Sequence, residues 1–93
     1  MKYSIERTTQ FKKDFKLAER QGLNVDELQK VILMLANGEM LPEEYKDHEL
    51  KGNYNGHREC HIEPDWLLIY KISESILVLS LVRTGSHSRL FKK

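Results

Sequence analysis

A chain of 93 residues is long enough for one domain with a modest core, and we predict a single domain over residues 1–93. Its composition, 40% hydrophobic and 31% charged, is that of a globular protein in water, and no apolar run approaches the roughly 18 residues of a membrane span. The N-terminus lacks the apolar segment of a signal peptide, and the single cysteine, Cys60, excludes an intramolecular disulfide. We therefore expect a cytoplasmic protein without a membrane partner, in which Cys60 is a core residue.

The net charge of +1 is unevenly distributed along the chain. Four cations and no carboxylate follow Val82: Arg83, Arg89, Lys92 and Lys93. By contrast, residues 39–49 carry five carboxylates and one lysine. A positive potential confined to one segment suits a phosphate site or an acidic partner better than non-specific nucleic-acid binding. We interpret the final two lysines as a solvated tail.

Periodicity predicts a strand over residues 2–7 and then two helices. The first helix is predicted between a Thr8 or Thr9 cap and Gly22, and the second between an Asn24 cap and Gly38. Their apolar residues recur at spacings of three and four: Phe11, Phe15 and Ala18 in the first helix, and Leu28, Val31, Ile32 and Leu35 in the second. These stripes predict two amphipathic helices that pack on a core.

The second half of the chain predicts one helical turn after Pro42 and then β structure. Extended segments are expected at residues 48–51, 58–62, 67–72 and 76–82, with turns at 53–56, 63–66 and 73–75. The last strand is apolar on both faces, which indicates a position inside the sheet. The predicted fold is a two-layer α+β domain: a β-α-α unit followed by an antiparallel β meander, with the helices packed on one face of a small sheet.

Chemically active side chains gather at the ends of the predicted strands. They are His61, Asp65 and Trp66 in one segment, and Arg83, His87 and Phe91 in another. Strand parity puts Cys60 and Ile62 on one face and His61 on the other, so His61 points away from the helices if Cys60 faces them. Because the strands of a meander are neighbours, these residues are candidates for one split site, which His48 could join at a sheet edge.

This combination of side chains suits metal-independent cleavage of RNA. An imidazole, with a pKa of roughly 6.5, can remove the proton of a 2′-hydroxyl or donate one to the departing 5′-oxygen. The guanidinium of Arg83 would stabilise the charge on the phosphorane. Trp66 and Phe91 would stack on unpaired bases. Taken singly, Trp66 is more often a packing residue, and Asp65 is most often a turn former.

The spacing of the histidines does not predict a metal site. His57 and His61 are four residues apart, which on a strand spans about 13 Å and gives no helical ligand pair. Neither a cysteine cluster nor a carboxylate-rich loop completes a site. We expect no metal and no cofactor, and we interpret His57 as a bystander at the far end of its strand.

Five runs carry a family resemblance: Tyr45-Lys46-Asp47-His48, Leu50-Lys51-Gly52, the segment from Gly56 to Trp66, Leu68-Ile69-Tyr70-Lys71 and Arg83-Thr84-Gly85-Ser86-His87. They resemble the YafQ toxins, the ribosome-dependent mRNA interferases of the RelE superfamily. The His61–Trp66 and Arg83–His87 elements are specific to that branch. The resemblance covers nearly the whole chain, including parts of the first predicted helix.

The resemblance implies a RelE-like fold and a type II toxin that cleaves mRNA in the ribosomal A site and so inhibits translation. It implies catalytic positions at His48, His61, Asp65, His87 and Arg83, and RNA-binding aromatics at Trp66 and Phe91. The implied partners are the 70S ribosome with its rRNA and mRNA, and a DinJ-like ribbon-helix-helix antitoxin in a heterotetramer. Operator DNA would be bound only through the antitoxin complex.

Two other functions fit the same fold. A ParE-like gyrase inhibitor is a toxin that acts by binding and needs no acid–base residues. A plain RNA- or ribosome-binding module needs none either. Three histidines together with Asp65 and Arg83 favour the enzyme.

Overall fold

In the computed structural model, which describes residues 1–91, five strands form one mixed sheet. The strands are β1 (Ser4–Arg7), β2 (His48–Glu49), β3 (Arg58–Glu63), β4 (Trp66–Ser73) and β5 (Val78–Gly85). The helices are α1 (Thr9–Arg20), α2 (Val25–Ala36) and α3 (His87–Phe91), with 3-10 turns η1 (Glu43–Tyr45) and η2 (Gly52–Tyr54). The strand order is β1-β5-β4-β3-β2, in which β1 is parallel to β5 and the other pairs are antiparallel. The predicted meander is confirmed, with β5 inside the sheet.

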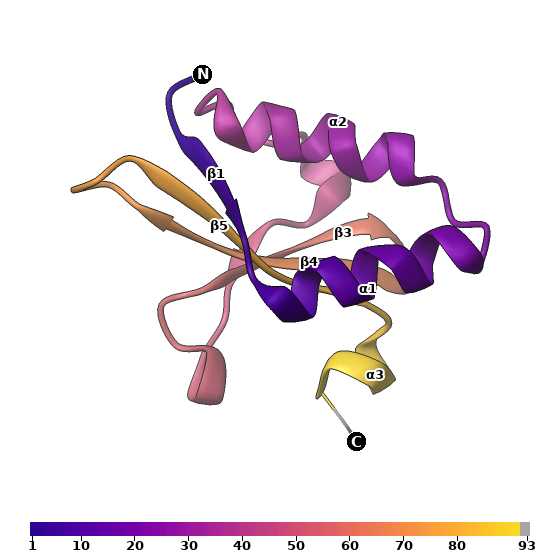
Figure 1. The fold of residues 1–93 in the computed structure, drawn as a ribbon. Coiled ribbons are helices and arrows are strands. Elements are labelled where there is room, and N and C mark those ends of the chain that lie inside the picture. The colour runs from indigo at the N-terminus through magenta and orange to yellow at the C-terminus, as the bar shows by residue number, and fades with distance from the viewer. Residues whose placement is uncertain (92–93) are drawn as a thin grey trace.

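Helices α1 and α2 cover one face of this sheet (Figure 1). Thr8 and Asn24 cap them, each accepting a hydrogen bond from a backbone N–H of the first turn. The Glu27 carboxylate accepts a hydrogen bond from the Tyr45 hydroxyl, which raises the pKa of Tyr45 to about 12. None of the described helices has the length and hydrophobicity of a membrane span.

The main core lies between these helices and the sheet, and it confirms the predicted two-layer α+β fold. Its fully buried side chains include Leu28, Val31, Cys60, Leu68 and Leu79. Burial raises the pKa of the Cys60 thiol, which is the environment of a structural cysteine and not of a nucleophile.

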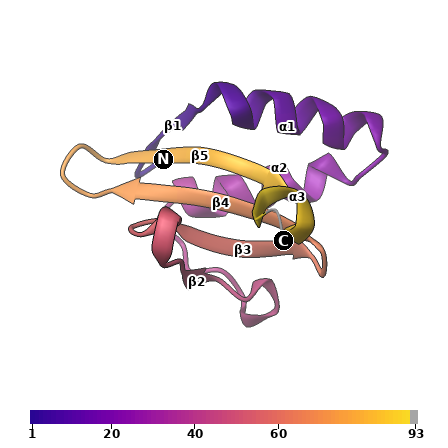
Figure 2. The ribbon, with the colours of Figure 1, turned by 90° about the horizontal axis from the view of Figure 1, so that it is seen from below.

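A short helix that the sequence analysis did not predict, α3, lies against the opposite face of the sheet (Figure 2). Its Leu90 is buried against Leu67 of β4 and Ile69 of β4 in a second, smaller core. Tyr54 of η2 and Phe91 of α3 pack at the margin of this core. The face away from α1 and α2 is therefore partly covered, and the candidate site lies at the end of the sheet beside α3.

A register shift in β5 determines where Arg83 lies. Ile69 pairs with Arg83 and Tyr70 pairs with Leu81, so Val82 is an extra residue in β5. In an unbroken strand Arg83 would share the helix-covered face with Leu81, because alternate residues face the same side. The bulge instead moves Arg83 to the face of Ile69, where the candidate site lies.

Thr8 joins α1 to β5, and its removal provides a test of this junction. Its hydroxyl accepts from the Phe11 N–H at 2.9 Å and donates to the Val82 carbonyl oxygen at 2.8 Å. We expect Thr8→Ala to lower the free energy of unfolding by about 1–2 kcal/mol in urea denaturation. The neighbouring exposed Thr9→Ala is the matched control, with an expected change below about 0.5 kcal/mol. Equal effects of the two substitutions would contradict this role of Thr8.

Candidate active site

Three imidazoles and a phenyl ring form a continuous row at one end of the sheet. The ring centroids are 6.4 Å apart for His48 and His61, 5.6 Å apart for His61 and His87, and 6.1 Å apart for His87 and Phe91. These side chains come from β2, β3 and α3. The structure thus brings together residues that are far apart in sequence, as the split-site hypothesis requires.

The carboxylate of Glu59 contacts two of these imidazoles. Its Oε1 lies 3.4 Å from Nε2 of His48 and 3.5 Å from Nε2 of His61, and the Glu59 side chain is only 4% exposed. On the other side of the His48 ring, Nδ1 lies 2.8 Å from the Lys46 carbonyl oxygen. A carbonyl oxygen only accepts, so this nitrogen carries a proton. Glu59 therefore orients two rings and provides a counter-charge to an imidazolium.

Asp65 orients the third imidazole. Its Oδ1 accepts a hydrogen bond from the His87 backbone N–H at 3.1 Å and lies 3.2 Å from Nδ1 of His87. The backbone hydrogen bond and then the ring contact lower the pKa of the Asp65 carboxyl. With Nδ1 donating to Asp65, Nε2 is the nitrogen that His87 offers to a substrate. This geometry supports an orienting role for Asp65.

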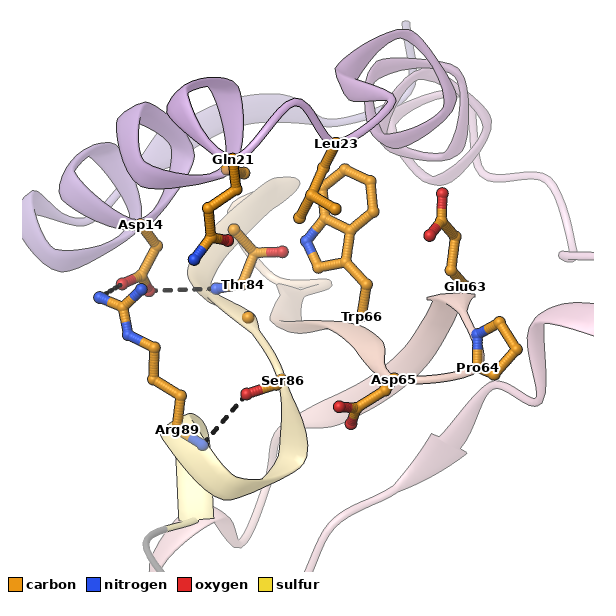
Figure 3. A pocket seen from close by; sticks show the side chains of 12 residues that line it. Asp14, Gln21, Leu23, Glu63, Pro64, Asp65, Trp66, Thr84, Ser86 and Arg89 are labelled. Carbon is orange, nitrogen blue, oxygen red and sulfur yellow. Dashed lines mark hydrogen bonds and ion pairs between the residues drawn. The ribbon is translucent and has the colours of Figure 1, made fainter.

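The guanidinium of Arg83 is held by a buried carboxylate of α1. Its Nε and Nη2 donate to the two oxygens of Asp14, each at 3.1 Å, and Nη2 of Arg89 donates to the same carboxylate at 3.0 Å. The Thr84 backbone N–H donates as well, at 3.2 Å (Figure 3), and so does the Gln10 amide, at 3.1 Å. Asp14 is 1% exposed. One carboxylate thus links α1, β5 and α3.

The charges in this cluster depend on one another. Burial by itself would raise the pKa of the Asp14 carboxyl, but the hydrogen bonds from Arg83, Gln10 and Thr84 outweigh burial and hold the pKa below its usual value. The contact with Asp14, and to a smaller extent the nearby Tyr54, raise the pKa of Arg83. One carboxylate facing two guanidinium groups leaves this end of the site with net positive charge.

Trp66 lacks the open ring face that a stacking platform requires. It is 3% exposed and packs in the main core, on the helix-covered side of β4. This burial contradicts the prediction that Trp66 stacks on an unpaired base. Its Nε1 has no hydrogen-bond partner among the described residues, and the indole forms part of a pocket wall next to Leu23 and Asp65 (Figure 3).

No role in the site was predicted from the sequence for Asp14, Glu59 or Tyr54. Asp14 falls on the apolar face of α1, where a charge needs a buried partner, and this signal was available. Glu59 shares a strand face with His61, which was also visible. Tyr54 lies in a predicted turn, and no local pattern indicates that its ring meets Phe91 edge-on at 5.9 Å. Lys92 and Lys93 lie outside the described residues.

Comparison with known proteins identifies the family of this chain. The family model described as "Bacterial toxin of type II toxin-antitoxin system, YafQ" matches residues 3–92. The chain is 42% identical over 88 residues to the mRNA interferase toxin YafQ of Escherichia coli K12, covering 94% of each chain. The chain belongs to the YafQ family of bacterial toxins.

Solved structures of similar toxins share the fold. The E. coli DinJ–YafQ complex contains a chain that matches with a TM-score of 0.88 and 41% identity, covering 96% of this chain and 98% of that one. A metal-bound toxin from Helicobacter pylori matches with a TM-score of 0.90 and 45% identity, covering 96% and 99%. Both chains are thus similar to this one in sequence as well as in fold.

In this YafQ family member, one set of side chains could hold a metal ion. Glu59, His61 and His87 each offer a ligand atom, and these atoms lie within 4.8 Å of one another. Two imidazoles and a carboxylate suit ions such as Zn²⁺ or Cu²⁺. The spacing of His57 and His61 does not predict this set. The imidazoles of His61 and His87 are both expected to transfer protons, so metal binding and acid–base chemistry would compete for them.

The Asp14 cluster predicts a specific pH dependence of stability. Because the pKa of Asp14 is lower in the folded than in the unfolded state, its contribution is complete above about pH 4 and is lost as the pH falls through the folded pKa. Asp14→Asn leaves two guanidinium groups without their counter-charge, and we expect it to lower the free energy of unfolding by about 3–5 kcal/mol at pH 7. Urea denaturation between pH 2.5 and 7, at about half-unit steps, measures both effects.

The matched control is Asp26→Asn, at an exposed position in the first turn of α2. Its expected cost is below about 1 kcal/mol, because an exposed carboxylate at a helix N-terminus contributes no more than that. If Asp14→Asn were as stable as this control, the proposed importance of the buried cluster would be wrong.

Proposed function

We propose that this toxin, an mRNA interferase, cleaves mRNA in the ribosomal A site by metal-independent general acid–base transphosphorylation. The observation that carries the proposal is the row of His48, His61 and His87, whose rings are oriented by Glu59 and Asp65. Proton transfer by well-placed imidazoles accelerates a reaction by about 10²–10⁴ for each group. The chain is 42% identical in sequence to an mRNA interferase over 94% of each chain, and this similarity supports the same chemistry.

In the proposed reaction, the 2′-oxygen of one nucleotide attacks the adjoining phosphorus. One imidazole takes the 2′-hydroxyl proton, and another donates a proton to the 5′-oxygen as the P–O5′ bond breaks. The products are a 2′,3′-cyclic phosphate and a 5′-hydroxyl. Asp65 acts through His87, which it holds in one orientation.

We assign the stabilisation of the phosphorane to Arg83. Two of its nitrogens, Nε and Nη2, donate to Asp14, so this carboxylate does not occupy Nη1. The Tyr54 side chain lies near the same guanidinium. A guanidinium fixed along one edge presents its other edge with little loss of conformational entropy when phosphate binds. Phe91, next to His87 in the row, supplies an aromatic surface for RNA.

We further propose the partners that a toxin of this family requires. The E. coli YafQ structure contains the antitoxin DinJ, and a DinJ-like ribbon-helix-helix antitoxin in a heterotetramer would neutralise this toxin. Operator DNA would be recognised by the antitoxin in that complex. The toxin would act in the cytoplasm, on mRNA held by the 70S ribosome.

Substitution of the histidines tests catalysis directly. We expect His61→Ala and His87→Ala each to lower the rate of mRNA cleavage at least about 100-fold and to abolish growth arrest, because each removes a proton-transfer group. His57→Ala, outside the row, is the matched control and should keep full activity. Primer extension on a defined mRNA, with and without programmed ribosomes, measures cleavage. Circular dichroism and antitoxin binding verify that the variants fold.

Full toxicity of both variants would support the binding-only alternative, a ParE-like gyrase inhibitor or a ribosome-binding module. Equal cutting of naked and ribosome-bound mRNA would contradict ribosome dependence. An mRNA with sulfur in place of the bridging 5′-oxygen then identifies the general acid, since a thiolate departs without protonation. The variant that lacks the acid should regain activity on this substrate, and the variant that lacks the base should not.

Metal independence is tested by stripping the toxin and not the ribosome, which needs its own magnesium. We expect toxin treated with EDTA and then desalted to cleave at the untreated rate. Added Zn²⁺ should inhibit reversibly, because Glu59, His61 and His87 would bind it and the two imidazoles would then be unavailable for proton transfer. A loss of activity after EDTA that Zn²⁺ restores would overturn the metal-independent mechanism.

A further inference from the structure

Beside the histidine row lies a pocket to which neither the motifs nor the proposed catalytic step assigns a function. It measures about 390 Å³ and is lined by Lys51, Asn53, Tyr54, Leu90 and Phe91. Phe91 belongs to both regions, because its ring lies 6.1 Å from that of His87 and 5.9 Å from that of Tyr54. The pocket is therefore a direct extension of the catalytic row.

The walls of this pocket are aromatic and rigid. Tyr54 and Phe91 stand nearly perpendicular, with an angle of 84° between their ring planes, and so form a corner. Both rings pack against the small core around Leu90, which is 5% exposed. A planar ligand that stacks on one of these rings meets the edge of the other, and it pays little entropy to order them.

Charge distinguishes this pocket from four other pockets among the described residues. Those four include carboxylates in their walls, for example Asp65 beside Trp66 and Asp47 beside Arg58. The Tyr54–Phe91 pocket has the cation Lys51 and no carboxylate. It is therefore compatible with an adjoining phosphate, whereas the carboxylates in the walls of the other four pockets disfavour one.

The loop that carries Lys51 and Asn53 is held in shape by its backbone. Gly52 has a φ of 69°, in the left-handed region that favours glycine, and the 3-10 turn η2 begins at this residue. Lys51 and Asn53 on either side of it are both exposed. Lys51, from the Leu50-Lys51-Gly52 motif, thus presents a cationic group at the pocket mouth. Asn53, the residue after the motif, presents an amide group there.

We propose that this pocket binds an unpaired nucleobase of the mRNA, next to the nucleotide whose phosphate reacts at the histidine row. The base stacks on one of the rings of Tyr54 and Phe91 and meets the edge of the other, the Asn53 amide donates to and accepts from the edge of the base, and Lys51 contacts the neighbouring phosphate. The inference rests on the proposed function only in taking RNA as the substrate. It adds a subsite through which the toxin discriminates among codons.

Binding is measured with a single-stranded RNA that is 2′-O-methylated throughout, so that it cannot be cleaved, and that carries one 2-aminopurine. Stacking on the wild-type toxin should quench its fluorescence. Tyr54→Leu should weaken binding about 5- to 150-fold, the loss that one stacked base represents, and Tyr54→Phe should keep most of the affinity. Asn53→Ala should weaken binding and reduce the differences between bases at that position.

Lys51→Met has a distinct signature. Removing one phosphate contact should weaken binding about equally for all sequences and reduce the slope of log Kd against log salt concentration by about 0.7. Lys30→Met, on exposed α2 in the opposite layer, is the matched control and should leave both quantities unchanged. On programmed ribosomes Lys51→Met and Asn53→Ala should raise KM and keep kcat within about twofold, unlike variants of the histidines.

The exposed Lys51 and Asn53 can be replaced without disturbing a core, so these two variants decide the question even if Tyr54→Leu fails to fold. Wild-type affinity, salt dependence and KM in both would overturn the proposal. Because the modified RNA is not a substrate, its binding tests the pocket independently of catalysis. A wild-type toxin that binds this RNA but does not cut mRNA on ribosomes would overturn the proposed function and leave the pocket supported.

Discussion

The buried carboxylate of Asp14 is the constraint on which the arrangement of the site depends. An unpaired charge in this position would cost several kcal/mol, and it is compensated only when groups from α1, β5 and α3 converge on it. A five-residue helix such as α3 is not stable by itself, so its position is determined by tertiary contacts. Arg89 provides one of them, on the same helix that carries His87 and Phe91. A charge on α1 thereby positions His87 and Phe91, which it does not touch.

The proposed chemistry places a further demand on the charges around the histidines. During transphosphorylation one imidazole gains a proton while another loses one, so the total charge of the row is unchanged. The new charge develops on the phosphorane, whose stabilisation we propose for Arg83. Glu59 contacts His48 and His61, and Asp65 contacts His87, so each ring has a carboxylate to orient it. The two carboxylates and the guanidinium thus have separate tasks, orientation and charge stabilisation.

Sequence periodicity predicted the parts of this structure that depend on local spacing. The caps of α1 and α2, the placing of Cys60 in the core and the outward direction of His61 all follow from it. The bulge at Val82 does not follow from periodicity, because the hydrophobic pattern of a strand does not reveal an extra residue. A strand without this bulge would put Arg83 on the helix-covered face. Trp66 was misassigned because an aromatic residue at a strand end has the same pattern whether its ring faces solvent or core. The family resemblance supplied the list of site residues, and the structure shows how they meet.

Glu59 provides an argument against a toxin that acts by binding alone. Its side chain is 4% exposed, and its ion-pair partners among the described residues are His48 and His61, which are charged only when protonated. For the fold alone, an apolar residue of similar volume at this position would be neutral or stabilising, since burying a carboxylate is costly unless the pairing is permanent. A binding surface gains nothing from a counter-charge whose value depends on the protonation of its neighbours. A reaction that protonates an imidazole does gain from it, because the carboxylate is already in place when the imidazolium forms.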